Sequence, residues 1–224
     1  MKKIEAVAFD FDGTLYSFEA IRRPYMLRYW YRIKSIRTFV HARQAMRLEQ
    51  FKSSEEMLSF QDKWVSERLN ITPHKARERF EKLMIHGLAS SLKPSRQRLG
   101  LEPFLTECVD KGIKIILISD LPLEEKLKAI GLAHLPWAAK VAADDIGVLK
   151  PRPEIFKAAF EKANCDPAQS IYIGDREDTD GQGARGLDMT FIQMATTSRK
   201  KMDQFVKSHW PVFQNFEQVR SYLF

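Results

Sequence analysis

Short, mostly apolar runs alternate along the chain with longer stretches in which apolar residues recur at helical spacing. The apolar runs predict strands buried on both faces, at residues 4–9, 113–118, 140–143, 170–174 and 189–193. Helical patterns lie between or after them, at residues 102–111, 124–130, 154–163, 183–185, near 199–207 and 215–222. This alternation predicts an α/β fold: a doubly wound, Rossmann-like parallel sheet with right-handed crossovers.

The stretch after the first strand interrupts this alternation. From about residue 17 to residue 93 the apolar spacing is helical and there is no strand pattern. Helix-start signals recur inside it, with Ser53 and Ser54 ahead of two acids, and Thr72 ahead of Pro73. We therefore predict an all-helical domain, residues 17–93, inserted into an α/β core domain made of residues 1–16 and 94–224.

Length and composition suit a globular protein with one core and a small inserted domain. The chain has 224 residues, of which 44% are hydrophobic and 29% charged. It contains no apolar run of about 18 residues, so we expect no transmembrane segment, and its first strand turns acidic too soon for a secretory signal. Cys108 and Cys165 have no metal-ligand spacing. We expect both to be reduced thiols of a cytoplasmic protein.

The basic residues are concentrated in the predicted insert. The net charge is +7, and the segment from Arg22 to Lys52 holds a single acid, Glu49. Three interpretations stay open. Arg22, Arg23 or Arg28 binds a second anionic group of a substrate; the face from Tyr25 to Arg47 contacts anionic lipid or nucleic acid; or the segment is a solvated helix face. We expect the last for most of the arginines and the first for one or two, and lipid or nucleic-acid contact least.

Chemically capable side chains follow three of the predicted strands. Asp10 and Asp12 follow the first strand, Ser119 ends the second, and Asp175 follows a later one. The carboxyl ends of neighbouring parallel strands meet at one edge of a sheet, where open α/β folds bind ligands. Two acids there cost stability unless a cationic group or a proton compensates them. A divalent cation is the simplest compensation, and it makes one acid a candidate nucleophile.

Four motifs occur in order along the core. The first is Asp10-Phe11-Asp12-Gly13-Thr14-Leu15, and the second is Ser119 at the end of Ile-Leu-Ile-Ser. The third is Lys150 before Pro151, and the fourth is Gly174-Asp175 with further acids up to Asp180. Together they resemble the motifs of the haloacid dehalogenase superfamily of aspartate-nucleophile hydrolases. The predicted insert stands where that family places its first type of mobile cap.

The resemblance implies a phosphomonoester hydrolase that uses Mg²⁺, forms an aspartyl-phosphate and acts on a small phosphorylated metabolite. Asp10 would be the nucleophile and a metal ligand. Asp12 would be the general acid and base, and a metal ligand through its backbone carbonyl. Asp175 would bind the metal directly, supported from further out by Asp178 or Asp180, of which Asp180 fits the family pattern better. The phosphoryl group would be bound by Ser119, Lys150, Gly13 and Thr14, and Lys150 would also restrain Asp10.

Other activities of the family stay in view. An acid at Asp12 favours phosphate transfer over dehalogenation, because a leaving alkoxide needs a proton. Sugar-phosphate mutases share all four motifs, and a non-catalytic binding protein with a basic cap is a further alternative. Asp120 stands where the family often has a neutral residue. It either forms an Asx turn on the local backbone or faces the insert.

Overall fold

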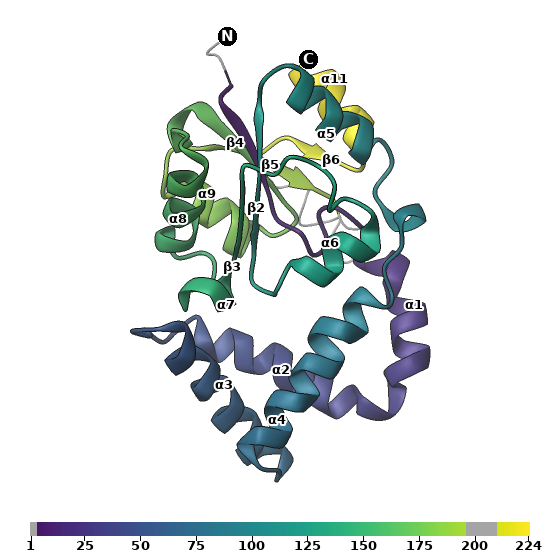
Figure 1. Cartoon of the computed structure of the whole chain (residues 1–224), viewed down its shortest axis with the longest axis vertical. Coiled ribbons are helices and arrows are strands. Elements are labelled where there is room, and N and C mark those ends of the chain that lie inside the picture. Colours follow the sequence, from purple (N-terminus) through teal and green to yellow (C-terminus); the bar gives the residue numbers. More distant parts are fainter. Residues whose placement is uncertain (1–3, 196–209) are drawn as a thin grey trace.

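The computed structural model describes residues 4–195 and 210–224. Within them the chain builds a six-stranded parallel sheet in the order β3-β2-β1-β4-β5-β6 (Figure 1). The strands are β1 (Ala6–Phe9), β2 (Lys114–Ser119), β3 (Ala139–Ala142), β4 (Ser170–Gly174), β5 (Thr190–Met194) and β6 (Val212–Phe213). The predicted doubly wound α/β fold is confirmed.

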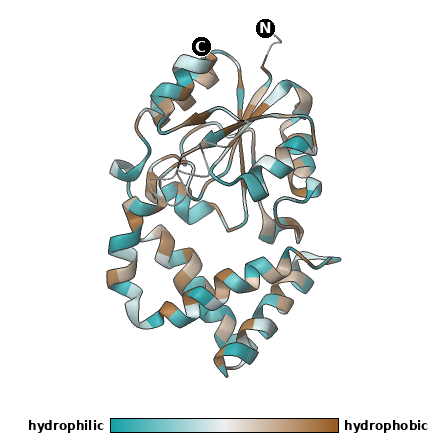
Figure 2. Cartoon of the chain, turned by 180° about the vertical axis from the view of Figure 1, so that it is seen from behind, coloured by the Kyte–Doolittle hydropathy of each residue, from teal (hydrophilic) through white to brown (hydrophobic). Residues whose placement is uncertain are grey.

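Helices cover both faces of this sheet. Figure 1 shows α5 (Leu101–Asp110), α6 (Glu124–Ile130) and α11 (Phe216–Leu223) on one side, and α8 (Pro153–Ala163) and α9 (Gln182–Arg185) on the other. Alternate residues of β1 enter the two cores, because successive side chains of a strand point to opposite faces. Val7 and Phe9 join the first core, and Ala6 and Ala8 join the second. Figure 2 shows the hydrophobic residues concentrated in the central strands.

Strand β1 is the centre of the topology. It pairs with β2 through Phe9 and Leu117, and with β4 through Phe9 and Ile173. The chain runs outward from β1 through β2 to β3, and then returns to the other side of β1 with β4. Residues that follow β1 therefore lie at the switch point of the sheet, flanked by the ends of β2 and β4.

The first part of the segment between β1 and β2 is helical, as predicted. It contains α1 (Phe18–Tyr29), a tight turn at Trp30–Arg32, α2 (Ile33–Met46), α3 (Ser54–Leu69) and α4 (Pro73–Phe80), which continues in wider turns to Gly87. Ser53 caps α3 by accepting a hydrogen bond from the backbone NH of Glu56 at 3.2 Å, and Thr72 caps α4 in the same way. These helices lie beyond the carboxyl edge of the sheet (Figure 1). The domain limits at residues 16/17 and 93/94 stay a prediction.

Two short elements were not predicted. Residue Ala143, expected at the end of a strand, instead begins α7 (Ala143–Ile146), and β6 is a two-residue strand at the sheet edge. The expected basic helix near residues 199–207 lies outside the described residues. Cys108 and Cys165 are both free thiols. Within the described ranges, no helix combines the length and the apolar character needed to cross a bilayer.

Candidate active site

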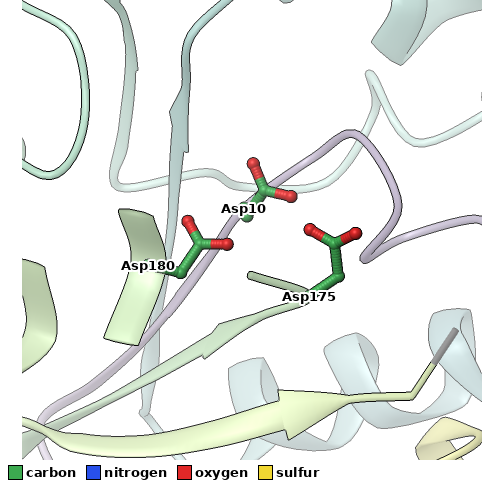
Figure 3. Close-up of side chains that lie close together, drawn as sticks. All are labelled: Asp10, Asp175 and Asp180. Carbon is green, nitrogen blue, oxygen red and sulfur yellow. The ribbon is translucent and has the colours of Figure 1, made fainter. Parts of the chain in front are cut away.

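Three carboxylates converge at the carboxyl edge of the sheet. One oxygen each of Asp10, Asp175 and Asp180 lies within 4.8 Å of the others, and Figure 3 shows the three groups gathered around a common space. Asp10 follows β1, Asp175 follows β4, and Asp180 lies in the turn after it. Asp10 and Asp180 are buried and Asp175 is half-buried. The pairing of β1 with β4, together with the turn that follows β4, therefore brings together residues up to 170 positions apart in the sequence.

Lys150 connects two of these acids. Its Nζ lies 2.7 Å from Oδ1 of Asp10 and 2.7 Å from Oδ1 of Asp180, and it also donates to the Tyr172 hydroxyl at 3.3 Å. Burial favours the neutral amine, but the facing carboxylates hold the pKa of Lys150 well above its ordinary value. Burial raises the pKa of Asp10, against the lowering effect of Lys150. One ammonium among three acids leaves a net negative charge at this edge, which favours a further cation.

Two glycines make the close approach of these loops possible. Gly13 has a φ of +96°, and a Cβ placed on it would lie 2.4 Å from Oδ2 of Asp175. A Cβ on Gly174 would lie 2.5 Å from Cβ of Asp180. In the turn after β1, the hydroxyl of Thr14 donates to Oδ2 of Asp10 at 2.9 Å. Both oxygens of Asp10 therefore accept hydrogen bonds, one from Thr14 and one from Lys150.

Asp12 makes a separate set of contacts. The hydroxyl of Tyr16 donates to its Oδ1 at 2.7 Å, and the ammonium of Lys126 is paired with its Oδ2. Lys126 is fully buried, with its Nζ 4.6 Å from the centre of the Phe11 ring. Sequence reasoning missed Lys126, because the run from Glu124 to Ile130 has the pattern of an ordinary amphipathic helix.

The remaining predicted residues take different positions. Ser119 is buried at the end of β2, where its Oγ accepts a hydrogen bond from the backbone NH of Leu121 at 3.1 Å. Asp178 is bound to the guanidinium of Arg176 at 2.5 Å and 3.0 Å, and its side chain is 64% exposed. Of the two supporting acids considered, Asp180 lies in the carboxylate cluster, and Asp178 is held by Arg176 at the surface.

Asp120 faces the helical insert. Its Oδ2 pairs with Arg47 of the loop after α2 at 2.5 Å, and its Oδ1 accepts a hydrogen bond from the backbone NH of Lys150 at 3.0 Å. Arg47 also donates from Nε to the carbonyl of Lys150 at 2.9 Å. The insert is thereby tied directly to the residue that bridges Asp10 and Asp180.

A second arginine strengthens this connection. Arg43 donates to the carbonyl of Asp120 at 3.0 Å and pairs with Asp144 of α7 at 2.9 Å. The arginines considered from the sequence lie elsewhere: Arg22 and Arg23 are exposed, and Arg28 donates to Ser90 at 3.5 Å. Within the insert, Arg43 and Arg47 at the carboxyl-terminal end of α2, rather than the arginines of α1, contact the sheet edge.

Comparison with known proteins agrees with this geometry. A family model described as haloacid dehalogenase-like hydrolase matches residues 4–188. The chain is 31% identical over 104 residues to a glyceraldehyde 3-phosphate phosphatase from Methanopyrus kandleri, covering 45% of this chain and 44% of that protein. It is 31% identical over 121 residues to a phosphoserine phosphatase from Thermus thermophilus, covering 50% and 44%. The matches thus span less than half the length of these curated relatives.

Among solved structures, the HAD hydrolase YfnB from Bacillus subtilis, crystallised with magnesium, is similar over the whole molecule. The TM-score is 0.70 at 14% sequence identity, and the match covers 99% of each chain. That identity is low, so the likeness is one of fold. With the family model matching most of the chain, and with the four motifs placed together at one edge of the sheet, the chain belongs to the haloacid dehalogenase-like hydrolases.

Proposed function

We propose that this chain is a Mg²⁺-dependent phosphomonoester hydrolase that acts on a small phosphorylated metabolite through an aspartyl-phosphate formed on Asp10. The observation that carries the proposal is the cluster of Asp10, Asp175 and Asp180, in which Lys150 bridges the two buried acids Asp10 and Asp180, with the acid Asp12 two residues from the nucleophile. The relatives named as glyceraldehyde 3-phosphate phosphatase and phosphoserine phosphatase support hydrolysis of phosphate esters.

The donor set fits Mg²⁺, a hard cation that prefers oxygen ligands. Asp10 and Asp175 would hold the ion through carboxylate oxygens, and Asp12 through its backbone carbonyl. Asp180 suits a supporting role, because it already accepts from three donors: its Oδ1 from Nζ of Lys150 at 2.7 Å and from the Tyr172 hydroxyl at 3.2 Å, and its Oδ2 from the backbone NH of Arg176 at 3.1 Å. A bound Mg²⁺ would neutralise negative charge on the transferring phosphoryl oxygens.

Asp10 is held for attack by its two hydrogen-bond donors, Thr14 and Lys150. In the first step a carboxylate oxygen of Asp10 bonds to phosphorus while the bond from phosphorus to the ester oxygen breaks. A protonated Asp12 gives its proton to the departing oxygen. In the second step Asp12 takes a proton from water, whose oxygen bonds to phosphorus. Phosphate leaves and the carboxylate of Asp10 is restored.

Neighbouring groups would bind the phosphoryl oxygens during both steps. Ser119 ends the strand next to β1, so its hydroxyl lies at the same edge as Asp10. The ammonium of Lys150 and the backbone of Gly13 and Thr14 complete the set. Positioned donors of this kind act where charge spreads in the transition state, and they need no reorganisation when it forms.

Turnover of p-nitrophenyl phosphate tests the proposal. The wild-type chain should hydrolyse it with Mg²⁺, and a chelator should stop the reaction. Replacing the nucleophile in Asp10→Asn should reduce the rate more than about a thousandfold. The surface variant Asp178→Asn serves as the matched control and should retain activity. A purified, folded wild-type chain with no turnover of p-nitrophenyl phosphate or of a panel of phosphorylated metabolites would support the non-catalytic alternative.

A further inference from the structure

The corner between α1 and α2 exposes large apolar side chains. Leu27 is 70% exposed, Trp30 69% and Ile33 40%. The adjoining Tyr31 packs its ring against Trp30, with centroids 6.3 Å apart. Figure 1 places this corner on the side of the insert away from the sheet. The patch is therefore separate from the carboxylate cluster and is not explained by the proposed hydrolysis.

The exposed side chains are held outward by a buried face of the same helix. Ile21, Tyr25 and Tyr29 of α1 face inward at helical spacing, and the hydroxyl of Tyr25 donates to the carbonyl of Leu83 at 3.1 Å. The opposite side of α1 and the start of α2 line a groove of about 810 Å³. Its walls combine Leu27, Trp30 and Ile33 with the arginines Arg22, Arg23 and Arg37.

The charge around this corner is of one sign. Between Ala20 and Leu48 the chain has eight basic residues and no acidic one, although the net charge of the whole chain is only +7. Arg43 and Arg47 are paired with acids of the core. The other six are exposed or half-buried around the apolar corner: Arg22, Arg23, Arg28, Arg32, Lys34 and Arg37.

We propose that the α1–α2 corner docks on an anionic phospholipid bilayer. Trp30, Leu27 and Ile33 enter the headgroup region, where an amphipathic surface gains from burying apolar area, and the surrounding arginines bind lipid phosphates. The aliphatic side chains Leu27 and Ile33 favour lipid over nucleic acid as the partner. Nucleic-acid sites use cations for the phosphates and aromatic rings for the bases, whereas aliphatic side chains at the centre of the patch find apolar contacts in lipid. The docking is peripheral and is independent of the proposed hydrolysis.

Co-sedimentation of the full chain with vesicles tests this proposal. We expect binding to vesicles of equal parts phosphatidylcholine and phosphatidylglycerol, and none to phosphatidylcholine alone. Trp30→Ala should weaken partitioning roughly tenfold, since it removes a large buried apolar area. Arg22→Gln and Arg37→Gln should each weaken it roughly fivefold, and higher salt should weaken it further.

Matched control variants test whether vesicle binding depends on the α1–α2 corner or on any exposed ring or charge. Tyr222→Ala removes another exposed aromatic ring, and Lys63→Gln with Lys75→Gln removes two exposed charges from α3 and α4, so both should bind as the wild type does. Melting curves by circular dichroism confirm that each variant is folded. Equal binding to the two vesicle types, no binding to either, or full binding by a folded Trp30→Ala would overturn the proposal. Preferential binding of single-stranded DNA over the anionic vesicles would overturn it in favour of nucleic acid.

Discussion

The ammonium nitrogen of Lys150 lies 2.7 Å from Oδ1 of Asp10, and both side chains are buried. Asp180 accepts from the same nitrogen at the same distance. This ion-paired group places the proposed nucleophile, and removal of its one cation leaves two buried carboxylates without their partner. Its contribution can be measured in stability as well as in activity.

Lys150→Met should lower the free energy of unfolding by about 3–5 kcal/mol, because it strands buried charges. Urea denaturation without Mg²⁺ measures this change. Lys157→Met, at an exposed position on α8, should have little effect. Adding Asp180→Asn to Lys150→Met should recover part of the loss. A Lys150→Met chain as stable as the wild type would show that the pair does not hold the site together.

Gly13→Ala should impair metal binding more than it impairs folding. Its φ of +96° strains an alanine, and the added Cβ would meet Oδ2 of Asp175 at 2.4 Å. We expect a loss of roughly 1–2 kcal/mol in stability from the backbone strain. We also expect a clear rise in the Mg²⁺ concentration needed for half-maximal activity.

Gly112→Ala is the control for the backbone effect. Gly112 has a φ of +71°, but a Cβ on it would meet nothing within 4 Å. It should lose similar stability while keeping the wild-type Mg²⁺ requirement. Equal Mg²⁺ requirements in Gly13→Ala and Gly112→Ala would rule out the predicted displacement of Asp175.

Asp120→Asn should loosen the contact between the insert and the core. Burial acts to raise the pKa of Asp120, but Lys150 and Arg47 hold it below its ordinary value. A depressed pKa in the folded state adds stability above the unfolded pKa, near about 3.9, and that stability is lost as the pH falls through the folded value. We expect Asp120→Asn to cost about 1.5–3 kcal/mol at neutral pH.

The pH dependence distinguishes charge pairing from packing. Thermal or urea denaturation of the wild type and of Asp120→Asn should show the difference between their free energies of unfolding begin to narrow as the pH falls below about 4, where Asp120 takes up a proton on unfolding. The difference should narrow further until the lower pH at which Asp120 is neutral in the folded wild type also. If the difference in free energy of unfolding stays constant down to the lowest pH at which the wild type folds, the stability lost in Asp120→Asn comes from packing and not from charge pairing. Asp178→Asn, at the exposed pair with Arg176, should show a much smaller difference throughout.

Lys126→Met should lower the rate of hydrolysis by an amount that depends on the leaving group of the substrate. Lys126 and Tyr16 fix Asp12, which is proposed to protonate the departing oxygen. Alkyl phosphates need that proton and should lose roughly a hundredfold in rate. The rate of p-nitrophenyl phosphate hydrolysis should fall less, because its leaving group is stable without a proton. Lys128→Met, exposed on the same helix, should leave both rates unchanged. Equal losses on the two substrates would argue against a role of Lys126 through Asp12.

Cys108 should resist thiol reagents until the chain unfolds. It is buried in the first core, and burial raises its pKa to about 12, so almost none of it is thiolate at neutral pH. Titration with a disulfide reagent should detect Cys165, which is half-buried, before Cys108. Rapid reaction of both thiols in the folded chain would contradict the burial of Cys108 in the first core.

The core of the fold could be predicted because its signals are local. Buried strands such as β2 are continuous apolar runs, and glycine ends a helix such as α6, where Gly131 has a φ of +84°. The two-residue strand β6 has no such signal, since its pairing with β5 depends on the finished sheet edge. Helix α7 has only four residues, and its first residue, Ala143, continues the apolar pattern of the strand before it.

The candidate site likewise has residues whose position could be predicted from the sequence and residues whose position could not. Asp10, Asp175 and Lys150 stand at strand or helix ends, so topology alone predicts that they meet. The partners of Asp12 and Asp120 could not be predicted. Lys126 is buried inside a pattern typical of a surface helix, and Arg47 belongs to a basic run that suggests a solvated face. Only the tertiary structure shows which of many similar cations is paired with an acid.

The most direct measurement of the central claim is chemical trapping of the phosphorylated residue. Borohydride reduces an aspartyl-phosphate to homoserine, and digestion with trypsin yields a peptide, residues 4–22, that contains Asp10 and Asp12. During turnover with Mg²⁺, mass spectrometry should find homoserine at position 10, and none in Asp10→Asn. Homoserine at position 12 or elsewhere, or rapid turnover with no trapped residue, would contradict the account.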